Sequence, residues 1–131
     1  EIISVLNKIK PPYNINGLSQ ETAVKKLLQN TLSTQVRKIL VERNKLIEAL
    51  LKCEFVEKIY PSDANFILIK VDDANFRYQQ FIDNGVVVRN RSNQPLCENC
   101  LRISIGTKEE TEQIIELLKT FNNAEKSIIY R

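Results

Sequence analysis

The spacing of apolar residues changes along the chain, and this change constrains the fold more than any other feature. Apolar residues first recur at a helical period of about 3.6 residues and then alternate with polar ones in short segments rich in Val and Ile, which is typical of strands. The predicted elements are, in order, a helix over 33–52, strands over 55–62 and 65–71, a helix from 72 or 73 to 84, strands over 86–89 and 101–105, and a helix over 108–121.

This order predicts an α+β fold for residues 31–121. Each helix has a single apolar stripe, so the helices must share one face of a largely antiparallel sheet. The expected architecture is a two-layer sandwich. Local signals agree with it, because Gly85 supplies the left-handed residue that ends a helix and Thr107 and Glu110 have the spacing of a capping box.

The N-terminal part gives a weaker pattern. Pro11 and Pro12 bar regular hydrogen bonding at their own positions, and we predict a loop over 1–18. Ser19 is predicted to cap a helix that ends at Leu28. In the long helix that follows, the period places Glu42 on the polar side.

Composition excludes several classes of function. The 19 basic and 16 acidic residues are interspersed, which disfavours binding to nucleic acid through bulk charge. The chain has no histidine, so Ser-His and Cys-His nucleophiles and the usual zinc ligand sets are absent. Cys97 and Cys100 have a C-x-x-C spacing, but only Cys53 remains to join them, so we predict reduced thiols and no metal site.

Two arginines are the candidate binding residues. In "LRISI" the alternation directs Arg102 away from the apolar face, and Arg89 in the preceding strand is expected on the same side. Two guanidinium groups that converge across a hairpin repel each other unless an anion lies between them, and arginine binds carboxylate or phosphate with two parallel hydrogen bonds. The alternative is that both are ordinary solvated residues or pair with Glu98 or Asp83.

Four segments in the same order and spacing resemble one known family. They are "KPPYNIN" at 10–16, "YPSDANFILIK" at 60–70, "NGVVVRNRS" at 84–92 and "CLRISIGTKEE" at 100–110. Together they are similar to the C-terminal third of histidinol-phosphate aminotransferase. The chain contains no methionine, which also indicates that it is a piece of a longer protein.

The resemblance implies an enzyme that depends on pyridoxal 5'-phosphate and has the fold of aspartate aminotransferase. It implies that residues 1–30 end the large cofactor-binding domain, 31–121 form the linking helix and small domain, and 122–131 are a C-terminal extension. Arg102 is implied to hold the carboxylate of glutamate or the phosphate of histidinol phosphate, and Arg89 to help hold the phosphate. Tyr13 is implied to line the substrate pocket, although a loop-anchoring aromatic residue is the alternative.

The chain departs from the family in one respect that bears on catalysis. The family's cofactor lysine lies in a Ser-Lys motif before a Gly-rich run that ends in arginine, and this sequence has no such motif. Lys8 and Lys10 lie beside prolines and do not match it. No catalytic residue is therefore assigned, and we expect this piece to be inactive alone and to bind no cofactor.

The expected function belongs to the parent protein. It is transfer of an amino group from L-histidinol phosphate to 2-oxoglutarate in histidine biosynthesis, by a cytoplasmic homodimer that has small-molecule partners and contacts neither nucleic acid nor membrane. The alternatives are an aromatic aminotransferase, a threonine-phosphate decarboxylase, or a non-catalytic α+β module that binds anions. The aminotransferase interpretation further predicts exposed apolar surface on 19–28 and on one side of 33–52.

Overall fold

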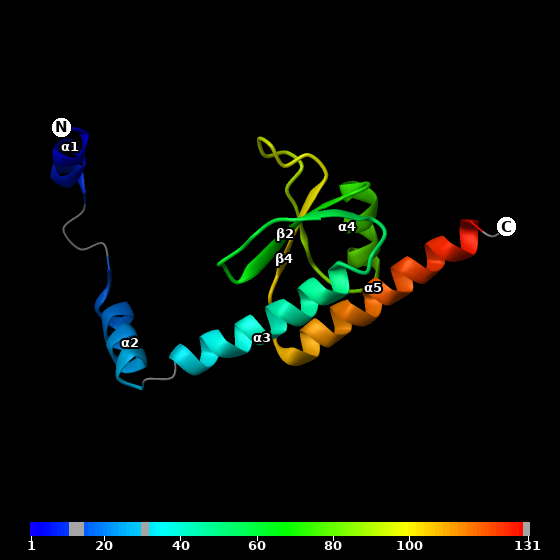
Figure 1. Ribbon diagram of the computed structural model, residues 1–131. Helices are drawn as coiled ribbons and strands as arrows, with labels where there is room; N and C mark the ends of the chain where they lie inside the picture. Colours follow the sequence, from blue (N-terminus) through cyan, green and yellow to red (C-terminus); the bar gives the residue numbers. More distant parts are fainter. Residues whose placement is uncertain (11–14, 30–31, 130–131) are drawn as a thin grey trace. The chain divides into compact units, whose positions relative to one another are not determined.

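A computed structural model describes the backbone of residues 1–10, 15–29 and 32–129, and the side chains within these ranges up to 122. The chain divides into two compact units, Glu1–Val36 and Arg37–Arg131. Figure 1 shows the elements of both units. Over the described ranges, no helix has the length and the apolar character that crossing a bilayer requires.

The first unit is helical. It contains α1 (Ile2–Ile9), α2 (Gly17–Leu28) and the beginning of α3 (Leu32–Leu50) (Figure 1). The predicted loop over 1–18 is therefore wrong for residues 2–9, because a proline blocks helix only at its own position and just before it. Lys10, which precedes Pro11, is extended, as that rule requires. Asn16, not Ser19, caps α2, and its side chain accepts a bond from the Ser19 amide at 2.8 Å.

Both short helices of this unit present apolar side chains to solvent, as predicted for 19–28. Neither α1 nor α2 has a buried residue. The exposed large apolar side chains of α1, α2 and the beginning of α3 are Ile2, Ile3, Val5, Leu6, Ile9, Leu18, Val24, Leu27, Leu28, Leu32 and Val36. So many exposed large apolar side chains in one small unit are typical of surface that another part of a protein covers.

The second unit is an α+β fold with a small antiparallel sheet, as predicted. After α3 come β1 (Val56–Ile59), β2 (Phe66–Val71), α4 (Ala74–Asp83), β3 (Arg89–Asn90), β4 (Cys100–Ser104) and α5 (Lys108–Ile129). The strand order in the sheet is β1-β2-β4-β3, and every neighbouring pair is antiparallel.

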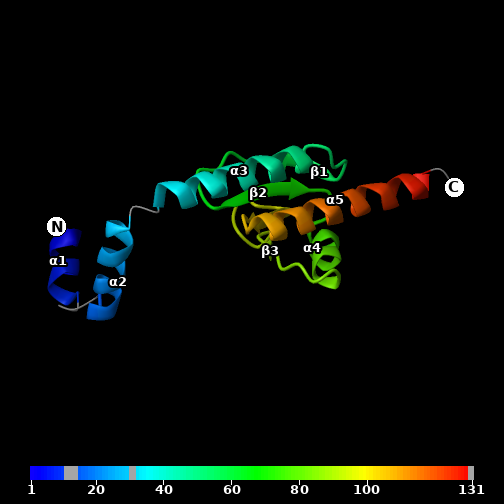
Figure 2. The ribbon, with the colours of Figure 1, turned by 90° about the horizontal axis from the view of Figure 1, so that it is seen from below.

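The hydrophobic core lies between one sheet face and the helices. Alternate residues of β2 and the residues Leu101 and Ile103 of β4 are buried, and α3, α4 and α5 contribute the opposing side chains. The core includes Leu46, Leu50, Ile67, Ile69, Val71, Phe81, Leu101, Ile103, Leu118 and Phe121. Phe81 and Phe121 meet edge to face with ring centroids 5.3 Å apart, which joins α4 to α5. Figure 2 shows α3 and α5 running along this side of the sheet.

Several predicted boundaries are confirmed and others are wrong. Asp73 caps α4 by accepting from the amides of residues 75 and 76, and Gly85 follows with φ of 76°. The capping box is present, since the Thr107 amide donates to Glu110 Oε2 at 2.7 Å. Residues 86–88 are not a strand, because the Val86 amide donates to the carbonyl of Phe81 and so follows the helix end. Helix α5 continues beyond its predicted end at 121.

Glu42 was assigned to the polar side of α3, but it is buried at 8% exposure. The reason is geometric, because Glu42, Leu46 and Leu50 are spaced four residues apart and lie on one face. Glu42 Oε1 accepts a bond from Lys45 Nζ at 2.8 Å, which supplies the charge partner that a buried carboxylate needs. Leu46 belongs to the same stripe and is 1% exposed.

Arg77 of α4 is buried and is held by Asp72. Its Nε donates to Asp72 Oδ1 at 2.9 Å, and a second bond joins Nη2 to Oδ2. The hydrogen bond from Arg77 lowers the pKa of Asp72 below its ordinary value of 3.8. The ion pair therefore stabilises the fold while Asp72 is ionised, and this contribution is lost as the pH falls through the depressed pKa.

Substitution of Asp72→Asn is expected to destabilise the chain at neutral pH, because the buried Arg77 guanidinium loses the attraction of the Asp72 carboxylate. The difference in the free energy of unfolding between the native and variant chains should shrink as the pH falls below about 4, where the native carboxylate becomes protonated. Urea unfolding from about pH 7 to about pH 2 measures it. A difference that stayed constant across this range would contradict the role of the ion pair.

Candidate functional site

Arg89 and Arg102 lie directly opposite each other in the sheet. The two residues are partners in the antiparallel pairing of β3 with β4, so their side chains leave the same face. This is the face away from the core, because Val88, Leu101 and Ile103, their neighbours along the strands, are buried. The structure thus brings together the two arginines that the sequence singled out.

Apolar side chains of β2 border Arg102 on its other side. Leu68 is its partner in the pairing of β2 with β4, and the Phe66 ring lies next in the row. The Arg102 guanidinium carbon is 5.2 Å from the centroid of the Phe66 ring. Arg102 Nε is buried and has no hydrogen-bond partner among the residues that the structure describes. A buried donor without an acceptor is costly, so this nitrogen is suited to an acceptor that the chain itself does not supply.

The alternative partners of the arginines are engaged elsewhere or absent. Asp83 Oδ1 accepts a bond from Gln79 Nε2 at 2.7 Å. Within the described ranges, no ion pair joins either Arg89 or Arg102 to an acidic side chain, including Glu98. Two neighbouring cations without an acid between them make a local positive field that favours an anionic ligand.

Asparagine side chains fix the connection between β3 and β4, a role that the sequence analysis missed. Asn90 Nδ2 donates to Asn75 Oδ1 at 2.8 Å, which ties β3 to the first turn of α4. Asn99 adopts a positive φ of 55°, donates to the Asp72 carbonyl and accepts from the Ala74 amide. Asparagine tolerates this backbone region better than most residues. These bonds hold the strands that carry both arginines against one helix end.

The cysteines and Tyr60 provide no nucleophile on this face. Burial raises the pKa of the Cys100 thiol and is also the main cause of the raised pKa of Tyr60. Both groups therefore stay protonated at neutral pH. Cys53, Cys97 and Cys100 form no disulfide, and the described residues contain no group of three or more Cys, Asp or Glu side chains placed to bind a metal ion.

Tyr13, the third predicted substrate residue, lies outside the described residues. The structure therefore gives no position for its ring relative to the two arginines. The candidate site on the second unit consists of Arg89 and Arg102 with the apolar border formed by Phe66 and Leu68. This set can bind and orient an anion, and it contains no group suited to transfer a proton at neutral pH.

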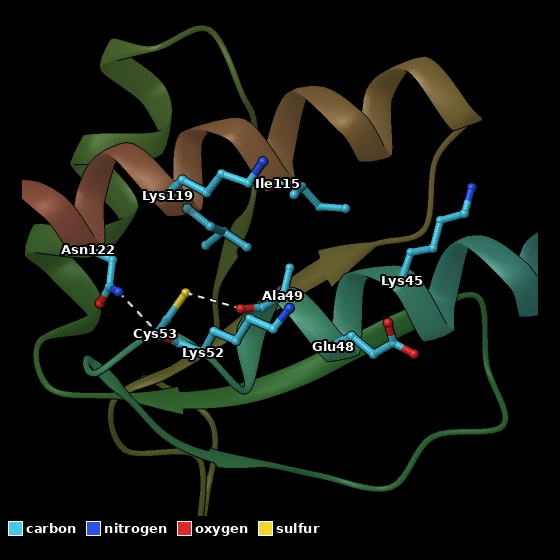
Figure 3. Close-up of a pocket in the computed structure, with 9 residues that line it drawn as sticks. Lys45, Glu48, Ala49, Lys52, Cys53, Ile115, Lys119 and Asn122 are labelled. Carbon is cyan, nitrogen blue, oxygen red and sulfur yellow. Dashed lines mark hydrogen bonds between the residues drawn. The ribbon is translucent and has the colours of Figure 1, made fainter.

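A cavity of about 360 Å³ lies on the helical side, between α3 and α5. Figure 3 shows that three lysines line it, together with apolar residues that include Ala49 and Ile115. Lys45 and Lys119 pair with Glu42 and Glu116, so two of its three lysines are already neutralised. For that reason the cavity is a weaker site for an anion than the sheet face that carries Arg89 and Arg102, which we call the arginine face.

Inorganic phosphate is expected to raise the unfolding midpoint of the 131-residue chain beyond the effect of chloride at equal ionic strength, because a bound anion relieves the repulsion between Arg89 and Arg102. The variant Arg102→Gln should lose this specific increment. Lys119→Gln, which removes a cation from the cavity on the helical side, should retain it. Thermal unfolding of the three chains measures the effect, and loss of the increment only in Lys119→Gln would place the anion in the cavity instead.

Comparison with known proteins gives consistent matches. The family model for aminotransferase class I and II matches residues 1–118. Histidinol-phosphate aminotransferase of Flavobacterium psychrophilum is 70% identical over 118 residues, which is 90% of this chain and 34% of that protein. The protein of the same name from Christiangramia forsetii is 57% identical over 124 residues, which is 94% of this chain and 35% of that protein.

A solved structure extends the likeness to the fold. Histidinol-phosphate aminotransferase from Clostridium acetobutylicum superimposes with a TM-score of 0.82 at 24% identity, over 94% of this chain and 38% of that one. The chain spans about a third of the length of the curated relatives it matches.

Proposed function

From the premise that this chain belongs to the aminotransferase class I and II family, we propose that it anchors the anionic end of the substrates in an aminotransferase that depends on pyridoxal 5'-phosphate. The observation that carries the proposal is the direct pairing of Arg89 with Arg102 on the sheet face away from the core. Neither has an acidic partner in the described ranges, and an arginine without one can bind a phosphate or carboxylate through two parallel hydrogen bonds.

The proposed substrates are L-histidinol phosphate and 2-oxoglutarate, which exchange an amino group to give imidazole-acetol phosphate and glutamate. The names of the similar proteins support this choice. So does the pair of cations, because a doubly charged phosphate uses two guanidinium groups more fully than a single carboxylate does. The same pair accepts either anion in turn, as a transaminase with two different substrates requires.

Lys45 and Lys70 do not fit the role of the cofactor's lysine. That lysine has to react as the neutral amine, which a lowered pKa favours. Here the pKa of Lys70 is raised by its bond to Glu57, and that of Lys45 is raised by its bond to Glu42. We therefore assign no step of the cofactor's chemistry to these residues, and we propose that another part of the complete protein holds it.

The proposed contribution of the chain is positional. Arg102 and Arg89 bind the phosphate or carboxylate at a fixed place on a rigid sheet, whose strands are held by the buried core beneath them. With the anionic end fixed, the amine or carbonyl at the other end has fewer orientations to explore before it reacts. Orientation of this kind can supply several kcal/mol of the barrier, at the order of magnitude known for intramolecular reactions.

We further propose how the chain sits in the complete enzyme. Residues 1–30 would end the large domain, 31–121 would form the linking helix and a two-layer small domain, and 122–131 would be a C-terminal extension that begins as the end of α5. The exposed apolar side chains of α1 and α2 support a covering large domain. A homodimer in the cytoplasm, with Tyr13 in the substrate pocket, completes the proposal.

In the complete enzyme, Arg102→Ala is expected to lower kcat/KM for both L-histidinol phosphate and glutamate by about ten- to hundred-fold, the usual range for loss of charge-assisted hydrogen bonds. Arg89→Ala should impair the phosphate substrate more than glutamate. The two half-reactions, followed separately through the absorbance of the cofactor, give both values.

The matched control for these variants is Lys119→Ala, which removes an exposed cation from the helical side and should leave both half-reactions unchanged. Equal losses for the two substrates in Arg89→Ala would contradict the assignment of that residue to phosphate. Failure of the native enzyme to turn over L-histidinol phosphate, with activity on O-phospho-L-threonine or phenylalanine instead, would contradict the proposed substrate.

A further inference from the structure

Two arginines of the second unit lie over phenylalanine rings, and their surroundings differ in one decisive respect. The Arg77 guanidinium carbon is 4.2 Å from the centroid of the Phe55 ring and 5.2 Å from that of Phe76. Arg77 also makes two hydrogen bonds to Asp72. It is a structural residue, because a carboxylate of the same chain uses its fork.

Arg102 contacts an aromatic ring but pairs with no carboxylate among the described residues. Its guanidinium carbon is 5.2 Å from the centroid of the Phe66 ring, the same distance as in the pair of Arg77 with Phe76. No acidic side chain in the described part of the second unit pairs with it, and its Nε has no acceptor. Both arginines thus contact an aromatic ring. They differ in that Arg77 binds a carboxylate of the chain, whereas Arg102 has none among the described residues.

We propose that Phe66 is a positioning residue for substrate binding: its ring holds the Arg102 guanidinium in place while leaving the hydrogen-bond donors of that group to the substrate's anion. The inference rests on the proposed function, in which Arg102 binds the phosphate or carboxylate. It assigns to Phe66 a specific part of that binding, which the resemblance to aminotransferases does not supply.

The physical reason is the difference between a ring and a carboxylate as a partner of arginine. A free arginine side chain loses considerable rotamer freedom when it is fixed, and a contact made beforehand reduces the loss on binding. An aspartate in the place of Phe66 would hold the guanidinium as firmly, but it would occupy the donors and neutralise the charge that the anion needs. The face of an aromatic ring attracts the cation and accepts no in-plane N–H bond.

The sheet fixes the ring where this contact requires it. Phe66 is the partner of Ser104 in the pairing of β2 with β4, and Leu68 is the partner of Arg102. Phe66 therefore stands diagonally across from Arg102 on the same face, at a separation that aromatic and long side chains span. Phe66 itself is only partly buried, so the contact does not depend on packing into the core.

The test compares Phe66→Leu, which keeps apolar bulk without a ring, with Phe66→Tyr, which keeps the ring, in the complete enzyme. Phe66→Leu is expected to raise KM for L-histidinol phosphate and for glutamate by about two- to five-fold, the range of an exposed cation–π contact, with a smaller change in kcat. Phe66→Tyr should restore the native KM. If Phe66→Leu does not fold, Phe66→Met is a second variant without a ring.

The matched control is Phe76→Leu, which removes a ring at the same distance from an arginine that Asp72 already holds. It should leave KM unchanged for both substrates. In an Arg102→Ala background, Phe66→Leu should have no further effect on KM, since its action passes through that arginine. The double variant separates positioning from a general loss of packing.

Three results would overturn the inference. The first is that Phe66→Leu has the native KM, and the second is that Phe76→Leu raises KM as much as Phe66→Leu does. The third is that Phe66→Leu raises KM by the same factor in the Arg102→Ala background as in the native enzyme. Each of these leaves the proposed function standing, provided that Arg102→Ala alone impairs both half-reactions. If instead Arg102→Ala retains the native KM for both substrates, the proposed anchoring fails first, and the role of Phe66 fails with it.

Discussion

The pairing register of β3 with β4 is the constraint on which the candidate site depends. It sets Arg89 opposite Arg102 and turns both away from the core. A slip of one residue would turn Arg102 toward the core and expose Leu101 and Ile103, which are at most 1% exposed. Burial of these apolar side chains therefore fixes the position of the two arginines, and the proposed anion site depends on the same alternation that builds the core.

What makes the arginine face suited to a ligand is the absence of competition within the described residues. Several other cations are paired with an acid of the same chain: Arg77 with Asp72, Lys45 with Glu42, and Lys70 with Glu57. Arg102 is bordered instead by Phe66 and Leu68. An acid placed next to Arg102 would pair with its guanidinium group and so occupy the group that we propose for binding the substrate.

The sequence predicted the parts of this arrangement that follow from periodicity. The strict alternation of apolar and polar residues over 101–105 correctly predicted the sheet face from which the Arg102 side chain projects. The order of the elements after residue 31 is also as predicted. Two local features were missed: the Val86 amide bonds to the Phe81 carbonyl at the end of α4 and does not join the sheet, and Glu42 lies on the same helix face as the buried Leu46. The bonds of Asn90 and Asn99 to the beginning of α4 join residues far apart in the sequence, and no local pattern reveals them.

The most direct measurement of the central claim is the NMR signal of the Arg102 Nε–H group in the 131-residue chain. This donor has no acceptor among the described residues. If the paired arginines receive an anion, addition of inorganic phosphate should shift this signal downfield and slow its exchange with water, as a new charge-assisted hydrogen bond requires. A signal that stays unchanged at phosphate concentrations that stabilise the fold would contradict the account.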